Sequence, residues 1–330
     1  MLSNNGKVAL LSAFPFLFFA AAYLSLACTG DGFNFSAPLA FFAGDASDVQ
    51  RLVFSQIALP RLAAAIIAGA GLALAGGTTQ SLFANPLADP SIIGVSAGAA
   101  LGAVAVLAAF PDIAPELGAL CGGLAAAAAV YKLGETQAGT SAVSTLLAGI
   151  AVNAFCAAMV GFFLYAANDS GLRGYIFWSL GSLERGGWRE IGAAAALSAP
   201  AWIAILLCAP SLNLISTGRE RAFHSGANVA FVWFVAMAAA AVATAAAVAL
   251  CGIIGFLGLI VPHVARAVFG ADNRFVLPAS ALLGAAVLTL ADVCARAFSP
   301  ADPIPVGIIT ALLGCPFFLA ILRKNTGGWE

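Results

Sequence analysis

The chain has 330 residues and a net charge of −1; 62% of its residues are hydrophobic and 9% are charged, with a mean hydropathy of +1.00. Soluble domains are about 45–50% apolar and about 25% charged, and a soluble globule of this length has too little interior to bury so much apolar surface. The charge balance also argues against a basic protein that binds nucleic acid. The composition therefore predicts a polytopic membrane protein.

Charge-free stretches mark the expected membrane spans in chain order. A helix needs about 20 apolar residues to cross the roughly 30 Å hydrocarbon core of a bilayer. The stretches without Asp, Glu, Lys or Arg lie at about 8–28, 62–80, 92–110, 117–131, 141–167, 191–210, 222–265, 275–291 and 303–322. Most of them correspond to one span each.

The first stretch has some features of a signal peptide, because Lys7 precedes it and LACTG follows its apolar part. It is longer than a typical signal-peptide core, however, and has no clean small-x-small cleavage site. We therefore expect an uncleaved first helix.

The stretch 222–265 is twice too long for one span. Its 44 residues would form a helix of about 66 Å. Gly252, Gly255, Gly258 and Pro262 fall within it, and these residue types weaken a helix and permit a reversal. We predict two spans there and ten in total, in an all-α single domain over 1–330.

An even number of spans places both termini on one side of the membrane. With the amino terminus inside, the inner segments carry eight basic residues and the outer segments six, and this bias favours cytoplasmic termini. It makes 211–227 a cytoplasmic loop and places 29–60 and 167–190 outside. The inner residues are Lys7, Lys132, Arg219, Arg221, Arg266, Arg274, Arg323 and Lys324, and the outer ones are Arg51, Arg61, Arg173, Arg185, Arg189 and Arg296.

Several chemistries have no support in the sequence. The seven cysteines form no CxxC pair and the two histidines form no HExxH motif, so we expect no metal site and no cofactor. The chain has no GxxxxGK[ST] phosphate-binding loop and three lysines in all. Acidic residues, which ion-coupled carriers need at mid-membrane, are missing from the predicted spans apart from Asp292. We interpret Asp292 and Arg296, at i and i+4, as a charge pair near the outer end of a span.

Small residues form faces on the predicted helices. Gly94, Gly98 and Gly102 recur at intervals of four and lie on one side of a helix, where they permit close approach of another backbone. Packing within the chain and a dedicated dimer motif are both consistent with this face.

Four stretches resemble the permeases that import cobalamin, ferric siderophores and heme. They are ALPRLAAAIIAGAGLALAGGTTQSLFANPLADPSIIGVSAGAALGA, LRGYIFWSLGSLERGGW, GIIGFLGLIVPHVARAVFGADNRFVLPASALLGAAVLTLADVCARAF and PVGIITALLGCPFFLAIL. The first contains a stretch similar to the NPLA-P-LG signature of these permeases, and the third has their glycine-rich turn, PH-x-x-R segment and D-x-R segment. The resemblance extends from about residue 50 to the carboxyl terminus.

The resemblance implies the fold of a type II ABC importer permease, with about ten helices per chain. Such a chain works as a homodimer, with two ATP-binding subunits below it and a periplasmic or extracellular substrate-binding protein above it. It implies a multi-pass protein of the bacterial inner membrane that is not an enzyme, because ATP is hydrolysed on the separate subunit.

In this family the loop between the sixth and seventh spans couples to the ATPase, and LNLISTGRERAFHSG lies at that place. Gly218 and Gly226 bracket a short charged segment, and we expect Thr217 to cap its start. Without the resemblance, a solvated inner loop with basic residues would be the favoured explanation of the segment. The residues assigned to coupling are Thr217, Gly218, Arg219, Glu220, Arg221, Ala222 and His224.

Two further groups are assigned by the resemblance. His263 and Arg266 follow Pro262 and are expected to face the cytoplasm, either as a second ATPase contact or support for the inner gate, or as basic anchors at the interface. Arg61, Arg296 and Arg51 are expected to dock the binding protein. Ala58 and Pro303 stand where the family often has other residues, which puts its full set of docking ion pairs in doubt.

Arg173 is expected at the outer mouth of the pathway, where its guanidinium can bind a carboxylate in bidentate fashion. Heme carries two propionates, and the LR-xxx-FW arrangement resembles the heme branch of the family. Heme is therefore favoured over a ferric siderophore, with cobalamin third. A loop residue that contacts the binding protein or lipid headgroups is the alternative for Arg173, and an ion-coupled secondary carrier is the alternative for the chain.

Overall fold

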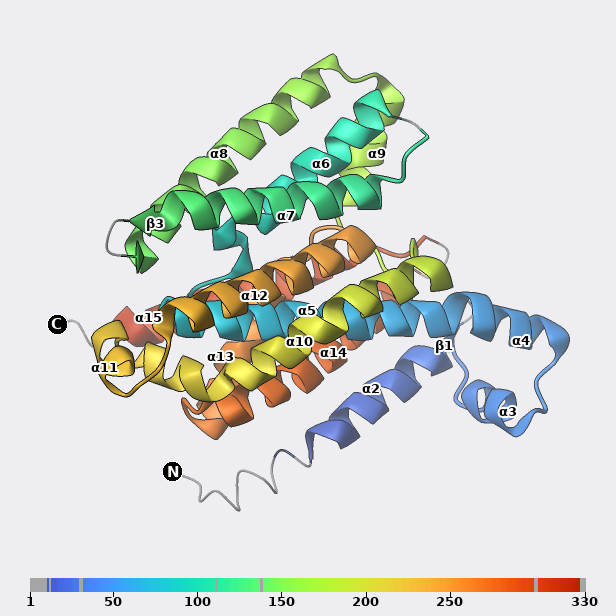
Figure 1. The fold of residues 1–330 in the computed structure, drawn as a ribbon. Coiled ribbons are helices and arrows are strands. Elements are labelled where there is room, and N and C mark those ends of the chain that lie inside the picture. Colours follow the sequence, from blue (N-terminus) through green and yellow to red (C-terminus); the bar gives the residue numbers. More distant parts are fainter. Residues whose placement is uncertain are drawn as a thin grey trace.

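The structure is a computed structural model that describes residues 11, 13–29, 32–110, 112–136, 139–299 and 302–326. These residues form a helical bundle (Figure 1). The long apolar helices are α5 (Leu59–Leu82), α7 (Pro115–Gly134), α8 (Ala142–Ala166), α10 (Trp188–Ser216), α12 (Val229–Cys251) and α14 (Asn273–Phe298). The shorter apolar helices are α2 (Phe14–Ala27), α6 (Val95–Ala109), α13 (Leu257–Phe269) and α15 (Val306–Thr326).

In the described part of the chain, six helices are long and apolar enough to cross a membrane and four shorter apolar helices accompany them, ten together. This number agrees with the prediction of about ten helices. The start of the first predicted span and Lys7 lie outside the described residues.

The connecting elements are short. They are the helices α3 (Ala37–Ala43), α4 (Asp48–Val53), α9 (Asp169–Ser179) and α11 (Arg219–His224), the π-helical turn η1 (Phe54–Ala58), the 3₁₀ turn η2 (Pro90–Ile93), and two antiparallel strand pairs, β1 (Cys28–Thr29) with β2 (Gly32–Phe33) and β3 (Glu135–Thr136) with β4 (Gly139–Thr140). The predicted outer segment 29–60 is thus partly helical. Its end continues through α4 and η1 into α5.

Polar side chains begin several of these helices. Ser47 forms a capping box with Gln50 at the start of α4, and Asn168, Asn228 and Asp272 accept backbone hydrogen bonds at the starts of α9, α12 and α14. Each cap satisfies backbone N–H groups that have no partner within the helix. The sequence therefore determines where these helices begin.

The predicted reversal within 222–265 is confirmed. α12 ends at Cys251 and α13 begins at Leu257. Gly252 and Phe256 have φ values of 74° and 66° in the connection. Such left-handed backbone suits glycine and is uncommon for a residue as bulky as Phe256.

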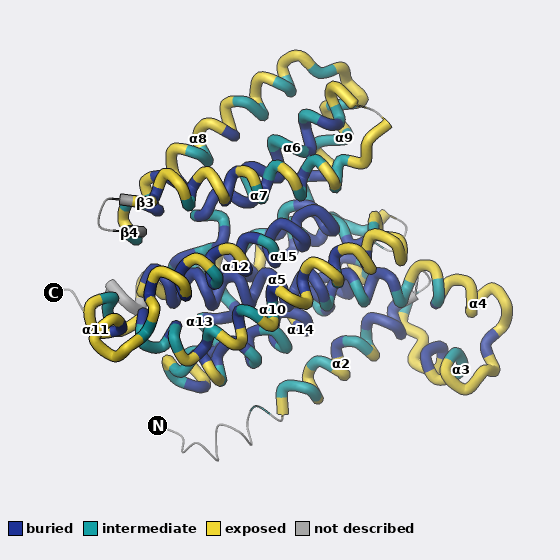
Figure 2. Tube along the Cα trace, in the orientation of Figure 1, coloured by how far each residue is buried: buried dark blue, intermediate teal, exposed yellow. Residues whose placement is uncertain are grey.

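α5 lies in the middle of the bundle, with α10, α12, α13 and α14 around it, whereas α6, α7 and α8 form a second layer next to α12 (Figure 1). In the continuous helical stretch Asp48–Leu82, 72% of an apolar 18-residue segment is buried inside the chain. In α8 only 11% of such a segment is buried. Figure 2 shows the same contrast between the dark tube of α5 and the yellow tube of α8. The centre of one chain is therefore packed solid.

Glycines permit the closest helix contacts. A Cβ atom added at Gly76 would meet the backbone of Gly258 in α13, and one at Gly69 would meet the backbone of Gly284 in α14. Gly98 and Gly102 of α6 face the backbone of α7 in the same way. The glycine face of 94–102 therefore packs within the chain at these two positions. Gly94 instead has a φ of 82° and precedes α6.

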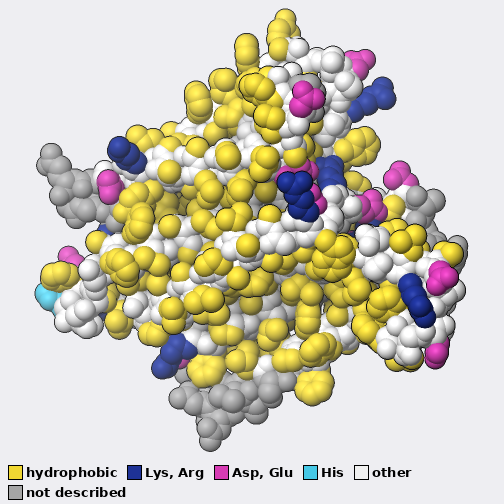
Figure 3. Space-filling view, turned by 45° about the vertical axis from the view of Figure 1, so that its right-hand side comes forward, with side chains coloured by type: hydrophobic (Ala, Val, Ile, Leu, Met, Phe, Trp, Pro, Cys, Tyr) yellow, Lys and Arg dark blue, Asp and Glu magenta, His cyan; other side chains and the backbone are white. Residues whose placement is uncertain are grey.

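The connecting elements gather at two ends of the bundle. In Figure 1, α11 and β3 lie at one end, and α3, α4, β1 and α9 lie at the other. We call the end with α11 the inner end and the opposite one the outer end, following the predicted orientation. Hydrophobic side chains cover most of the face in Figure 3, and charged side chains form a few isolated groups.

Candidate coupling and docking sites

The predicted coupling segment forms the short helix α11 at the inner end. Gly218 precedes it with a φ of 121° and Gly226 follows it with a φ of 83°. Both values lie in the region that favours glycine, so these residues do bracket the segment. The expected cap by Thr217 is wrong. Thr217 directly follows the last residue of α10, its hydroxyl donates to the carbonyl of Leu214 at 2.8 Å, and no side chain caps α11.

One face of α11 is anchored and the other is exposed. Ala222 is fully buried, whereas Glu220, Arg221 and His224 are exposed. Phe223 is 70% exposed, and its ring lies 5.9 Å from that of His224. Phe223 was not among the predicted coupling residues, although an aromatic residue within a charged loop is a signal for a contact site. Phe223 and its charged neighbours give α11 an apolar tip with a charged rim.

Arg219 differs from its neighbours because it points back into the chain. Its guanidinium carbon lies 5.2 Å from the ring centroid of Trp233 in α12, which is the geometry of a cation–π contact. Partial burial lowers the pKa of Arg219 from its ordinary value, and the nearby Tyr131 partly opposes this. Arg219 therefore holds α11 against α12, and the three consecutive charges do not share one surface.

Arg266 lies among polar groups between α5, α13 and α14. Its guanidinium donates to Gln80 Oε1 at 3.3 Å, to Asn273 Oδ1 at 3.1 Å, and in α5 to the Gly77 carbonyl at 3.0 Å and Ser81 Oγ at 3.3 Å. The expectation that it faces the cytoplasm is therefore wrong, because these acceptors hold it between helices. His263 is half-buried on the same helix.

The start of α14 is tied to the end of α10. Asn213 Nδ2 donates to Asp272 Oδ1 at 2.7 Å, and the Asn273 backbone N–H donates to Asn213 Oδ1 at 2.8 Å. Asp272 also forms an ion pair with Arg274 at 2.7 Å. Hydrogen bonds from Arg274, and a further one from Asn213, lower the pKa of Asp272 to about 2. Asn213 lies in the last turn of α10, just before the coupling segment.

A second polar cluster lies at the outer end. Asp292 is 1% exposed and accepts from Arg61 at 2.7 Å and from Arg296 at 3.0 Å. The Asp292–Arg296 pair confirms the predicted charge pair. Arg61 also contacts Glu184 at 2.5 Å, whose side chain is 49% exposed, and Arg296 donates to the carbonyl of Cys28 at 2.6 Å.

The arginines assigned to docking thus differ in their surroundings. Arg61 is buried and Arg296 is largely buried, and both bind groups of this chain. Arg51 is exposed on α4 and donates to the carbonyl of Gly44 at 2.5 Å. Arg173 is exposed on α9. The docking role of the first three and the pathway role of Arg173 stay predictions.

A cleft of about 400 Å³ at the outer end was not foreseen. It lies between α7, α10 and α12 and carries charges of both signs, from Arg185, Arg189, Glu116 and Glu190. Burial lowers the pKa of Arg185, and Glu116 partly opposes this. Both arginines were predicted to lie in an outer segment, but no sequence pattern indicated that they line one cleft with residues of α7.

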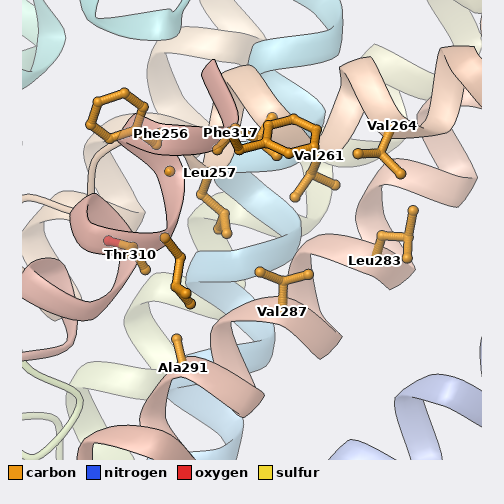
Figure 4. Close-up of a pocket in the computed structure, with 12 residues that line it drawn as sticks. Phe256, Leu257, Val261, Val264, Leu283, Val287, Ala291, Thr310 and Phe317 are labelled. Atoms are coloured by element: carbon orange, nitrogen blue, oxygen red, sulfur yellow. The ribbon is translucent and has the colours of Figure 1, made fainter. Parts of the chain in front are cut away.

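An apolar groove of about 190 Å³ runs between α13, α14 and α15 (Figure 4). Phe256 and Phe317 lie at one part of it, and Leu283 and Val287 of α14 form another wall. Within the described residues, no group of three or more His, Cys, Asp or Glu side chains is placed to hold a metal ion.

The ten apolar helices and the exposed helical loop at one end fit the fold of a type II ABC importer permease. The family model described as the FecCD transport family matches residues 17–324, and the chain belongs to this family. The FecCD family is a family of multi-pass membrane permeases of import systems for iron chelates, heme and cobalamin.

Relatives with different substrates resemble the chain. It is 38% identical over 329 residues to the hemin transport system permease protein HmuU of Yersinia pestis, covering 97% of this chain and 98% of that protein. It is 40% identical over 293 residues to the cobalamin import system permease protein BtuC of Halobacterium salinarum, covering 88% and 78%. It is 37% identical over 279 residues to the Fe(3+)-citrate import system permease protein YfmE of Bacillus subtilis, covering 82% of each.

The fold also matches solved structures. An inward-facing structure of a metal-chelate type ABC transporter superimposes with a TM-score of 0.83 and 29% identity, covering 96% of this chain and 99% of that chain. The PsaBC structure from Streptococcus pneumoniae matches with a TM-score of 0.55 and 16% identity, which shows a shared fold alone.

Proposed function

We propose that the chain is the permease subunit of an ATP-driven, binding-protein-dependent importer in the bacterial inner membrane. Two ATP-binding subunits dock at its inner end and hydrolyse ATP, while a substrate-binding protein docks at its outer end. The chain itself performs no chemistry. The observation that carries this proposal is α11, an exposed helix between two left-handed glycines at the inner end of a FecCD family member.

Two copies of the chain form the pathway in this proposal. The centre of one chain is filled by α5, so a bulky ligand has to pass along an outer face. α8 offers an apolar face with little cover, on which Leu147, Ile150 and Phe155 are more than 60% exposed. α15 offers another, which adjoins the groove in Figure 4 and contains Leu312 and Leu313. A second copy that covers such faces would place the pathway between the copies.

Heme is the substrate we favour. The similarity to the hemin permease covers nearly the full length of both chains, and Arg173 is an exposed cation in α9 that suits a propionate. Cobalamin is the second candidate, since the similarity to the cobalamin permease of Halobacterium salinarum reaches 40% identity over a shorter part of both chains.

ATP binding would close the two ATPase subunits and move α11 with them. Because the pathway opens outward in one state and inward in the other, the energy of nucleotide binding selects between two conformations of the permease. At the outer end, Arg51 is accessible to a binding protein. Arg61 would become accessible if a carboxylate of that protein replaced Glu184, its half-exposed partner.

The coupling role is tested by co-purification with the ATPase subunit from the same gene cluster. We expect Glu220→Ala/Arg221→Ala/Phe223→Ala to lose the ATPase or its stimulation, because these side chains form the exposed face of α11. Asn168→Ala, which alters only a helix cap at the outer end, is the control. Failure of the ATPase to associate even with the unaltered permease would contradict the importer assignment.

The substrate is tested by uptake into proteoliposomes that contain the complex and its binding protein, with hemin, cyanocobalamin and ferric citrate in parallel. We expect ATP-dependent uptake of hemin. Arg173→Ala should lower hemin uptake and Arg173→Lys should keep part of it, since lysine retains the charge but not the bidentate geometry. Uptake of cyanocobalamin alone would move the assignment to the second candidate.

A further inference from the structure

The polar groups at the inner end form one connected chain of hydrogen bonds across four helices. It begins with Asn213 in the last turn of α10, continues through Asp272 and Asn273 at the start of α14, and reaches Arg266 of α13 through Asn273 Oδ1. Arg266 then contacts Gln80, Ser81 and the Gly77 carbonyl of α5. Gln80 closes the network by donating to the Leu259 carbonyl of α13 at 3.1 Å.

The part of this network between α5 and α14 lies where water is scarce, whereas Asn213, Asp272 and Arg266 are half-buried. Asn273 and Gln80 are 0% and 2% exposed, and Ser81 is also 2% exposed. Buried hydrogen bonds cannot be exchanged for water without a cost, so breaking one leaves polar groups unpaired. Asn273 Nδ2 is already a buried atom with no partner among the described residues, so the network has little capacity to rearrange.

Asn213 is the residue that connects the network to the coupling segment. Its amide nitrogen donates to Asp272, the cap of α14, and its amide oxygen accepts from Asn273, the first residue of α14. These two bonds fix both the distance and the orientation of the end of α10. α10 ends at Ser216 and α11 begins at Arg219. Movement of α11 therefore acts directly on the turn that Asn213 holds, as well as on α12 through the contact of Arg219 with Trp233.

Resting on the coupling role proposed above, we propose that Asn213 is the positioning residue that transmits movement of α11 to α14, α13 and α5. Asn213 touches neither the ATPase nor the substrate. It acts by making the end of α10 and the start of α14 move together, while Arg266 extends the connection to the central helix. Coupling of this kind needs a physical link between two elements, and the two hydrogen bonds of Asn213 supply it.

The test uses the permease–ATPase complex with one spin label per permease at Val49→Cys, after replacement of Cys121, Cys294 and Cys315 by serine. Val49 is 73% exposed in α4, which continues into α5, so its label reports on the central helix. In the complex with unaltered Asn213, ATP and vanadate should change the distance between the two labels. Asn213→Ala should keep ATPase binding and hydrolysis but lower the population of the ATP-driven distance by about tenfold, as loss of hydrogen bonds to a charged group would.

The double variant Asn213→Asp/Asp272→Asn exchanges donor and acceptor. The carboxylate introduced at position 213 could still accept from the Asn273 N–H, and the amide introduced at position 272 could donate to that carboxylate. Because Asp272 Oδ1 also accepts the Arg274 N–H that caps α14, the exchange gives up this cap and keeps the link between the two helices. We expect the double variant to restore the distance change, whereas Asn213→Asp alone places two carboxylates together and should fail. If Asn213 only stabilised the fold, Asn213→Ala would reduce the yield of the complex and leave the ATP-driven distance change of the assembled complex intact.

Three results would overturn the proposal. They are an unchanged ATP-driven distance in Asn213→Ala, a double variant no better than Asn213→Asp, and a double variant that does not assemble. By contrast, absence of ATPase binding with unaltered Asn213 would contradict the coupling role of α11, so the two failures are distinguishable.

Discussion

Asp292 determines the charge balance of the outer polar cluster. Two arginines approach its carboxylate, and Glu184 supplies the second negative charge from a more exposed position. Buried ion pairs add little net stability, but removal of one partner leaves a buried charge without compensation. The cluster joins α5 to α14 and, through Arg296, to the end of α2.

Asp292→Asn should therefore be strongly destabilising. We expect a loss of about 3–5 kcal/mol in the free energy of unfolding, the range for a broken buried pair. Thermal unfolding of the purified permease in detergent measures the effect. Asp45→Asn, at an exposed position, is the control and should unfold like the unaltered chain. Equal melting temperatures for the two variants would contradict the account of the cluster.

Asp272 predicts a pH dependence at the inner end. Its pKa is lowered from 3.8 to about 2, mainly by hydrogen bonds from Arg274. A carboxyl group with a lowered pKa in the folded state stabilises the fold above its unfolded pKa, and this contribution is lost as the pH falls through its folded pKa. The stability difference between the unaltered chain and Asp272→Asn should be full at pH 6 and decline between about pH 4 and pH 2. Melting temperatures across this range measure it, and a constant difference would contradict it.

For single residues, the sequence predicted side-chain contacts between near neighbours in the chain and missed contacts between residues far apart in it. The Asp292–Arg296 pair followed from the i, i+4 spacing. The pairing of Arg61 with Asp292 joins residues 231 positions apart, and no local pattern indicates it. The same holds for Arg266, whose position after Pro262 suggested the cytoplasm, whereas its acceptors come mainly from α5.

The helices themselves were predicted well because their signals are local. Apolar length indicated the spans, and Gly252 together with the length limit of a span indicated the reversal before α13. The helical character of residues 48–58 was not foreseen, although Ser47 and Gln50 form a capping box that the sequence contains. The apolar tip of α11 also escaped prediction, because exposure of Phe223 depends on burial of the neighbouring Ala222.

The contact between α5 and α13 should tolerate no side chain at Gly76. A Cβ atom there would overlap the backbone of Gly258, which cannot shift as a flexible side chain can. We expect Gly76→Ala to lower the melting temperature and the yield of folded permease. Gly192→Ala in α10, where a Cβ meets nothing within 4 Å, is the matched control; it should be neutral or slightly stabilising, because alanine favours helix. Similar behaviour of the two variants would contradict this packing.

For the whole molecule, the solid centre leads to a prediction about assembly. If two copies meet through α8, a cysteine at Leu147 should form a cross-link between copies in the membrane, after replacement of the exposed native cysteines. Phe16→Cys in α2, which is 76% exposed, is the control and should form none. Cross-linking is read as a dimer band on a non-reducing gel, and equal bands from both positions would contradict a dimer face on α8.

The contacts of Gly76 with Gly258 and of Gly69 with Gly284 have a mechanical consequence. Where backbone meets backbone there is no layer of side chains whose rotamers could change to let one helix slide past another. α5, α13 and α14 are therefore expected to move as a single rigid body. During transport, helices are then expected to shift where side chains line the contact, as in the groove between α15 and α13–α14, and at the boundary between the two copies.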